Sequence, residues 1–339
     1  MIRADASPAI GAGHVMRCLA IAQAWRRAGG AVALASYQLP AALRARVLAE
    51  GVELLDVEPD GAAAADAAQE WRAAWVVLDG YLYGVQFTQQ LMDAVPRLLR
   101  VDDNGESVAP PATMLLNGNL HASAAMYPSG RFEVLAGPAY ALLRDEFREH
   151  CGRPRVARDP AQNVLITFGG SDPLGLTDRA YVSLLRAQAG RGLCVQIIRG
   201  GAERAATDDA PGESRVSVVR AATDMAARMA WADVAITAAG VTSTELLAVG
   251  TPAIQVITAD NQRRIAAAMQ QAGASILLGE ARDVTADSFV GPLLALLDDA
   301  PRRQRMIDAG RQLVDGRGPD RVVAAMLAHL SGRPASTTP

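Results

Sequence analysis

The sequence predicts an α/β protein made of two parallel-sheet domains, and three observations lead to this prediction. Short apolar runs alternate with helical stretches in both halves of the chain, as in the strand–helix–strand units that form a parallel sheet. The length of 339 residues exceeds the size at which a single hydrophobic core usually stops growing. Each half also opens with an apolar strand and a glycine-bearing turn, at Gly11 and Gly13 in the first half and at Gly169 and Gly170 in the second.

The first domain is expected at residues 1–147 and alternates strands with helices. Its strands are expected at residues 1–4, 32–36, 52–57, 75–79, 98–102 and 114–117. Its helices are expected at residues 14–28, 40–50 and 84–94. In the first helix, apolar residues recur at the spacing of one buried helix face: Val15, Cys18, Leu19, Ala22 and Trp25.

Residues 146–162 are rich in arginine and proline and lack apolar periodicity, which indicates a linker between domains. The second domain is expected at residues 160–330, with the alternative that its last helix returns to the first domain. Its strands are expected at residues 164–168, 193–199, 216–219, 234–237, 253–257 and 275–278. Its helices are expected at residues 176–189, 225–231, 242–249, 262–272, 286–297, 301–314 and 319–330. Residues 331–339 form a polar tail that we expect to be disordered.

Composition excludes several classes of partner. A formal net charge of −3 offers no basic surface for nucleic acid or an anionic membrane. No apolar run approaches the ~20 residues of a membrane span. Three unclustered cysteines and the absence of a leader signal favour a cytoplasmic protein. Four scattered histidines argue against a metal site, and we expect a monomer without a cofactor.

The first glycine-bearing turn contains Gly11, Gly13 and His14 and lies between a strand and a helix. Free N–H groups and a partial positive charge at a helix start favour bound anions such as phosphate. A dinucleotide fingerprint fits poorly, because Met16 occupies its third glycine position and no acid follows the second strand. The turn therefore favours a phosphate-bearing ligand other than NAD.

His14 falls in the first turn of the expected helix. The helix dipole disfavours a charged imidazole there, so the ring should be neutral and able to accept a proton. A structural role is the alternative. A histidine at a helix start open to ligand favours the functional role.

The second glycine-bearing turn contains Gly169, Gly170, Ser171 and Asp172 after an all-apolar strand. Ser171 or Asp172 could cap the next helix, and the paired glycines could equally let phosphate approach the backbone.

The third glycine-bearing turn precedes Thr242 and Glu245, which have the spacing of a capping box. Glu245 could instead accept hydrogen bonds from both hydroxyls of a ribose, but the spacing alone favours the cap. For Asn261, too, a capping role is the simplest interpretation.

Taken together and in order, these segments resemble one family. They read RADASPAIGAGHVMRCLAIAQAW, VVLDGY, VDDNGES, LLNGN, GPAYALLRDEF, ITFGGSDPLGLT and ITAAGVTSTELLAVGTPAIQVITADNQ. They resemble the UDP-sugar hydrolases of pseudaminic acid biosynthesis, a nonulosonic acid pathway; these enzymes are relatives of the MurG-type glycosyltransferases.

The resemblance implies a GT-B fold, with two Rossmann-like domains and a cleft between them. It implies metal-independent hydrolysis of UDP-2,4-diacetamido-2,4,6-trideoxy-β-L-altropyranose to UDP and the free sugar, with inversion at C1 and with His14 activating the attacking water. It also implies a substrate-binding set: Gly11, Gly13, Arg17, Tyr81, Gly169, Gly170, Ser171, Asp172, Gly240, Thr242, Glu245, Asn261 and Gln262. Three alternatives remain open: a MurG-like UDP-sugar glycosyltransferase, a hydrolysing UDP-sugar 2-epimerase and a catalytically silent nucleotide-sugar-binding module.

Overall fold

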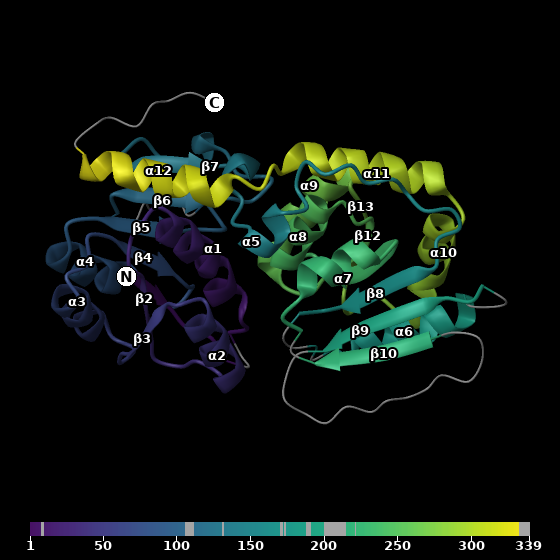
Figure 1. Cartoon of the computed structure of the whole chain (residues 1–339), viewed down its shortest axis with the longest axis horizontal. Helices are drawn as coiled ribbons and strands as arrows, with labels where there is room; N and C mark the ends of the chain where they lie inside the picture. Colours follow the sequence, from purple (N-terminus) through teal and green to yellow (C-terminus); the bar gives the residue numbers. More distant parts are fainter. Residues whose placement is uncertain are drawn as a thin grey trace. The chain divides into compact units, whose positions relative to one another are not determined.

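The computed structural model describes residues 1–7, 10–105, 112–130, 132–169, 172, 174–187, 191–199, 215–220 and 222–331. The chain divides into two compact units (Figure 1), one of Met1–Asp145 with Gly316–Pro339 and one of Glu146–Asp315. The tail expected at residues 331–339 falls, apart from Ser331, outside the described residues.

The first unit contains a seven-stranded sheet in the order β3-β2-β1-β4-β5-β6-β7, and its described strand pairs are all parallel. Its strands are β1 (Ile2–Ala4), β2 (Ala33–Ser36), β3 (Glu53–Asp56), β4 (Val76–Asp79), β5 (Leu98–Val101), β6 (Met114–Asn117) and β7 (Glu133–Ala136). Strand order changes direction between β1 and β4, and ligands of open parallel sheets bind beyond the carboxyl ends of the strands at such a point.

The helices of the first unit include one at the C-terminus of the chain. They are α1 (Gly13–Arg27), α2 (Ala41–Ala49), α3 (Gly61–Glu70), α4 (Val85–Ala94) and α12 (Gly318–Leu330), with short helices η1 (Ala124–Met126) and η2 (Pro138–Tyr140). Helix α12 packs against α1, and the indole Nε1 of Trp75 donates a 3.1 Å hydrogen bond to the carbonyl of Met326.

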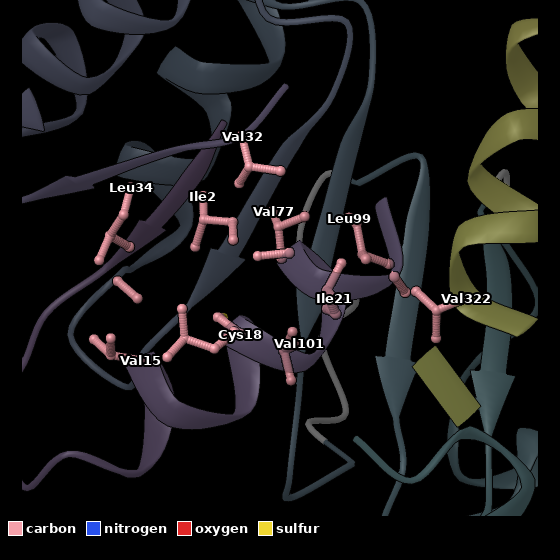
Figure 2. Packing of buried hydrophobic residues seen from close by; sticks show 14 of the residues in the cluster. Ile2, Val15, Cys18, Ile21, Val32, Leu34, Val77, Leu99, Val101 and Val322 are labelled. Carbon is pink, nitrogen blue, oxygen red and sulfur yellow. The ribbon is translucent and has the colours of Figure 1, made fainter. Parts of the chain in front are cut away.

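The core beneath α1 fixes where that helix begins. Figure 2 shows Val15, Cys18 and Ile21 of α1 pointing toward strand residues such as Ile2 and Val77 within one buried cluster. Burial of such side chains is worth roughly 1.5–3 kcal/mol each, so the apolar face predicted from the sequence holds α1 firmly on the sheet. The helix start at Gly13 and His14 is therefore held at the carboxyl end of β1.

Two elements of the first unit were missed by the sequence prediction. Helix α3 is a run of alanines without an apolar period, and it is recognisable only from its N-cap Asp60, whose side chain accepts the N–H of Ala63 at 2.8 Å. Its alanines bury against a second cluster in the unit. Strand β7 is a short edge strand of mixed polarity, so it lacks the apolar run by which a central strand is recognised.

The second unit contains a six-stranded sheet in the order β10-β9-β8-β11-β12-β13, again with parallel pairs. Its strands are β8 (Asn163–Thr167), β9 (Cys194–Arg199), β10 (Arg215–Arg220), β11 (Val234–Ala238), β12 (Ala253–Ile257) and β13 (Ser275–Glu280). Strand order changes direction between β8 and β11.

Helices alternate with most of these strands along the chain. They are α6 (Leu176–Ala187), α7 (Met225–Trp231), α8 (Val241–Val249), η3 (Asp260–Gln262), α9 (Arg263–Gln271), α10 (Ala286–Leu297) and α11 (Ala300–Leu313). The stretch predicted as a linker begins within a short helix, α5 (Asp145–Arg148). In the described ranges, no helix combines the length and the apolar character needed to cross a membrane.

Candidate functional site

The carboxyl edge of the first sheet is organised around His14. Its Nδ1 lies 2.8 Å from Oδ1 of Asp79, the last residue of β4. Because a carboxylate oxygen only accepts hydrogen bonds, this contact requires a proton on Nδ1, and a neutral ring then carries its lone pair on Nε2. A terminal nitrogen of Arg17 lies 3.3 Å from the same Nδ1. The two nitrogens are close because both donate to Oδ1 of Asp79.

Arg17 joins two acids that come from different loops. Its guanidinium donates to both oxygens of Asp79, at 2.6 Å each, from Nε and one terminal nitrogen. Its other terminal nitrogen donates to both oxygens of Asp103 at 2.7 and 2.9 Å. Such fork-shaped pairing is the strong form of charge-assisted hydrogen bonding, so Arg17 fixes both carboxylates.

The carboxylates stay ionised although they are buried. Burial by itself raises the pKa of Asp79, but the charge and hydrogen bonds of Arg17, with the bond to His14, outweigh it and hold the pKa below its ordinary value. The same competition between burial and Arg17 holds the pKa of Asp103 well below its ordinary value. Asp79 is therefore an anion that orients His14.

Two further side chains complete what we call the charge network (His14, Arg17, Asp79, Asp103, Tyr81 and Asn119). The hydroxyl of Tyr81 donates to Oδ2 of Asp103 at 2.6 Å, and Nδ2 of Asn119 donates to Oδ1 at 2.8 Å. Tyr81 also meets the imidazole edge-on, with ring centroids 4.7 Å apart. Since Tyr81 is 55% exposed, it links the buried ring to the surface of the unit.

The structure differs from the sequence prediction in how His14 is placed. A helix start open to ligand was expected, whereas the His14 side chain is 8% exposed, because Arg17, Asp79 and Tyr81 surround it. Of the predicted site residues, Arg17 and Tyr81 join His14 in the network. Gly13 begins α1, whose N-cap Ala12 makes no side-chain hydrogen bond. Gly11 adopts a φ of +80° just before it.

Asp79, Asp103 and Asn119 were not among the predicted site residues. Asp79 ends β4, Asp103 follows β5 and Asn119 follows β6, and these strands are neighbours in the sheet. The available signal was their position after apolar strands, since the carboxyl ends of adjacent parallel strands meet at one edge.

At the carboxyl edge of the second sheet, the ends of the neighbouring strands β8 and β11 are followed by glycine-bearing backbone. Gly169 follows β8 with a φ of +83°, and Gly240 is the N-cap of α8 with no side-chain cap. Gln262 accepts the N–H of Thr258 at 2.9 Å. A Cβ placed on Gly240 would lie 3.5 Å from Nε2 of Gln262. We call this the glycine edge (Gly169, Gly240 and Gln262).

The predicted capping box in this unit is wrong. Helix α8 begins at Val241, so Thr242 is its second residue and cannot serve as the N-cap; Glu245 lies in the helix and is 7% exposed. The N–H groups at the start of α8 therefore have no side-chain acceptor at the cap. The capping role considered for Asn261 is also wrong, because the N-cap of α9 is Gln262 and makes no side-chain cap bond.

The loop after β8 is only partly described. Gly170 and Ser171 lie outside the described residues. The carboxylate of Asp172 accepts the N–H groups of Leu176 and Thr177 at 2.9 and 2.7 Å. Asp172 therefore caps α6, which is one of the two roles that the sequence suggested for this turn. Among the side chains that the structure describes, no group of three or more His, Cys, Asp or Glu is placed to hold a metal ion.

Comparison with known proteins finds that most of the second unit is similar to a glycosyltransferase family. Residues 164–315 match the family described as Glycosyltransferase family 28 C-terminal domain. Spore coat polysaccharide biosynthesis protein SpsG of Bacillus subtilis (strain 168) is 25% identical over 204 residues, which cover 59% of this chain and 60% of that protein. The UDP-N-acetylglucosamine–N-acetylmuramyl-(pentapeptide) pyrophosphoryl-undecaprenol N-acetylglucosamine transferase of Nitratidesulfovibrio vulgaris (strain DP4) is 34% identical over 186 residues, 49% of this chain and 50% of that enzyme.

Among solved structures, MurG of Acinetobacter baumannii superposes with a TM-score of 0.65 at 18% identity and covers 96% of this chain and 99% of its own. This similarity confirms the predicted fold class, two parallel-sheet α/β units as in GT-B glycosyltransferases. The alignments with the two curated relatives span 60% and 50% of those proteins' lengths.

The prediction of a hydrolase acting on a UDP-sugar is wrong. The matched family and the Nitratidesulfovibrio relative are glycosyltransferases. The motifs were misleading because hydrolysis of a UDP-sugar and transfer of its sugar can both use a general base and a helix start that binds diphosphate. Neither motif specifies whether the nucleophile is water or a sugar hydroxyl.

Proposed function

We propose that this chain is a MurG-like UDP-sugar glycosyltransferase, which moves a sugar from UDP to an acceptor hydroxyl. The observation that carries this proposal is the family match over residues 164–315 together with the uncapped start of α8 inside it. The parallel sheet and the charge network of the first unit are consistent with a second role, activation of the acceptor.

We assign nucleotide binding to the glycine edge. The free N–H groups and partial positive charge at the start of α8 suit the diphosphate, with a dipole contribution of about 0.3–1 kcal/mol and more where the site excludes water. Gly169 and Gly240 lack side chains that would hold phosphate oxygens away from the backbone. Glu245, Thr242, Asn261 and Gln262 remain candidates for the ribose and sugar contacts, as do Gly170, Ser171 and Asp172 in the loop after β8.

We assign the base to His14. Its Nε2 would take the proton of the acceptor hydroxyl, the acceptor oxygen would bond to the anomeric carbon, and the bond from that carbon to the diphosphate oxygen would break, releasing UDP. Asp79 would stabilise the imidazolium that forms, as a carboxylate does for histidine in a catalytic triad. Gly11, Gly13 and Tyr81 would position the acceptor or the sugar.

The nucleotide assignment is tested by placing a side chain at the start of α8. Gly240 has a φ of −99° and room for a Cβ, so Gly240→Asp and Gly240→Asn should both fold and cap the helix. A carboxylate there repels phosphate, whereas the neutral amide of the same shape does not. Titration with UDP should show affinity about tenfold lower for Gly240→Asp than for Gly240→Asn. Equal affinities for the two variants would contradict the assignment.

The reaction class is tested by the dependence of UDP release on an acceptor. Purified protein is incubated with UDP-N-acetylglucosamine or with the UDP-diacetamido sugar suggested by the sequence, with and without a lipid-linked N-acetylmuramyl-pentapeptide acceptor. A transferase should release UDP only when the acceptor is present and should attach the sugar to it. Release of UDP and free sugar at the same rate in both mixtures would overturn the proposal.

A further inference from the structure

A basic pocket lies in the second unit, at the opposite edge of the sheet from the glycine edge. It has a volume of about 230 Å³ and is lined by His150, Arg153, Arg155, Arg158, Arg303 and Arg311, with Asp233 as the only carboxylate in its wall. Asp233 directly precedes β11, and residues 153–158 precede β8. The pocket is therefore at the amino ends of parallel strands whose carboxyl ends form the glycine edge.

The buried arginines of this pocket bond to neutral carbonyls rather than to acids. Arg155 donates to the carbonyls of Met229, Val249 and Ala232, at the ends of α7 and α8. Arg303 donates to the carbonyls of Leu296 and Leu297 at the end of α10. Both therefore close helix C-termini, which gives them a structural role and leaves their full charges in place.

The helix ends do not neutralise the pocket. Each helix C-terminus contributes about −0.5 charge, so the ends of α7, α8 and α10 together offset roughly one and a half of the five arginine charges, and Asp233 offsets one more. Asp233 is already held by Arg158 at 3.4 Å and by the N–H groups of Gln162 and Asn163. Of the acids just outside the wall, Asp298 pairs with Arg191. Glu149 near His150, and Asp159 and Asp299 near Arg303, add negative charge outside the wall. The wall itself contains five arginines and one carboxylate and is therefore positive.

The titration behaviour of the pocket agrees with this charge count. Burial, with the charges of Arg158 and Arg311, lowers the pKa of Arg155 to about 10, so it stays charged at neutral pH. Burial and the charges of Arg153 and Arg155 lower the pKa of His150, which disfavours a further positive charge there.

We propose that the basic pocket binds a phosphate group carrying two or more negative charges, such as a phosphate monoester or a diphosphate. Arg153 and Arg158 are exposed at the pocket and Arg311 is half-buried, so their guanidinium groups can reach an entering ligand. Arg155 and Arg303 stand behind them as fixed charges. The volume is many times the ~10–15 Å³ that one water requires, which is enough for a phosphate or diphosphate. This site is separate from the proposed nucleotide site and does not depend on the transferase function.

The test is a titration of the full chain with inorganic pyrophosphate in the presence of excess UDP, which occupies the nucleotide site if that assignment is correct. Saturable binding is expected, weakened about tenfold by Arg311→Gln. Because Arg311 also donates to the carbonyl of His150 at 2.8 Å, the exposed Arg153→Gln serves as a second variant that leaves the interior unchanged. The matched control is Arg305→Gln, an exposed arginine of the same helix α11 outside the pocket wall.

Comparison of the three arginine variants allows the pyrophosphate titration to be interpreted whether or not UDP binds. Loss of pyrophosphate affinity in Arg153→Gln and Arg311→Gln, with Arg305→Gln unchanged, supports the pocket even if UDP fails to bind. Absence of saturable binding to any phosphate probe, or equal affinity in all three variants, overturns it.

A second arm identifies the source of the phosphate. The protein is sedimented with vesicles of phosphatidylcholine with and without phosphatidic acid. Binding of pyrophosphate in solution indicates a soluble phosphate compound, and binding that appears only on phosphatidic acid, and is lost in Arg153→Gln, indicates a lipid headgroup.

Discussion

The carboxyl edges of the two sheets are built by different means although the sheets share a plan. In the first unit, Arg17 and His14 of α1, Asp79 at the end of β4 and Asp103 after β5 form a network of largely buried side chains. In the second unit, Gly240 leaves the start of α8 without a side-chain cap, and Gly169 follows β8 with a φ of +83°. The charged network holds the imidazole of His14 in one orientation, which suits the proposed base, and the uncapped backbone at Gly240 suits the proposed anion site.

The two carboxyl edges should also respond differently to amino-acid substitution. Loss of the buried Asp79 carboxylate would leave Arg17 with only Asp103 as a counter-charge and would leave the Nδ1 proton of His14 without its acceptor, which is costly in a low-dielectric environment. A backbone edge has little stored interaction energy, so a change there should alter binding more than stability.

The largest expected effect is on stability in the first unit. Asp79→Asn removes one of the two carboxylates that pair with Arg17, together with the acceptor of His14, and should lower the free energy of unfolding by about 3 kcal/mol. Asp172→Ala in the second unit removes only a helix cap, at about 1 kcal/mol. Urea unfolding followed by tryptophan fluorescence measures both, since Trp25, Trp71 and Trp75 lie in the first unit and Trp231 in the second. Similar losses for the two variants would contradict the comparison.

The next effect concerns turnover. His14→Ala should lower the rate of sugar transfer by about a hundredfold or more, as expected for a lost general base, while UDP affinity stays unchanged. The matched control is His329→Ala, which breaks another histidine–carboxylate pair of the same unit, 2.9 Å from Glu133. Glu133 begins β7 and therefore lies at the opposite edge of the sheet. The base assignment fails if both variants keep the wild-type rate.

A smaller effect is expected from acid. Asp79 and Asp103 have folded pKa values below the ordinary value of about 4, since Arg17 overcomes the effect of burial. Such groups stabilise the fold fully above the unfolded pKa and lose this contribution as the pH falls through the folded pKa. The free energy of unfolding of the first unit should therefore decline as the pH falls below about 4. In Asp103→Asn the decline should be shallower, and parallel curves for variant and wild type would refute the linkage.

The sequence predicted the backbone edge better than the charged one, for a physical reason. Gly169 and Gly240 are recognisable singly, because a glycine that directly follows an apolar strand indicates a turn at the carboxyl end of that strand. Arg17 and Asp103 are distant in sequence and meet only because β5 lies beside β4, and β4 beside β1. No periodicity encodes that strand order, so the network could not be assembled from the chain alone.

The secondary-structure elements of the fold were also predicted best where the signal is local in the sequence. Strands β8 and β11 are mostly apolar and were located to within one residue, whereas alanine-rich α3 was missed because it has no contrasting faces. The predicted capping box failed because the helix boundary is shifted: the N-cap of α8 is Gly240 and not Thr242. Helix ends are the least certain feature of a sequence prediction.

The smallest effect separates backbone strain from ligand contact within the second unit. Gly169 and Gly273 have φ values of +83° and +71°, and a Cβ on either meets no atom within 4 Å. Each substitution to alanine should therefore lower the free energy of unfolding by a similar amount, about 1 kcal/mol, from the left-handed backbone alone. Gly273 lies between α9 and β13, at the amino edge of the sheet, so only Gly169→Ala should also weaken UDP binding in a titration. If both variants bound UDP as the wild type does, the loop after β8 would not approach the phosphates, and the nucleotide would depend on the start of α8 alone.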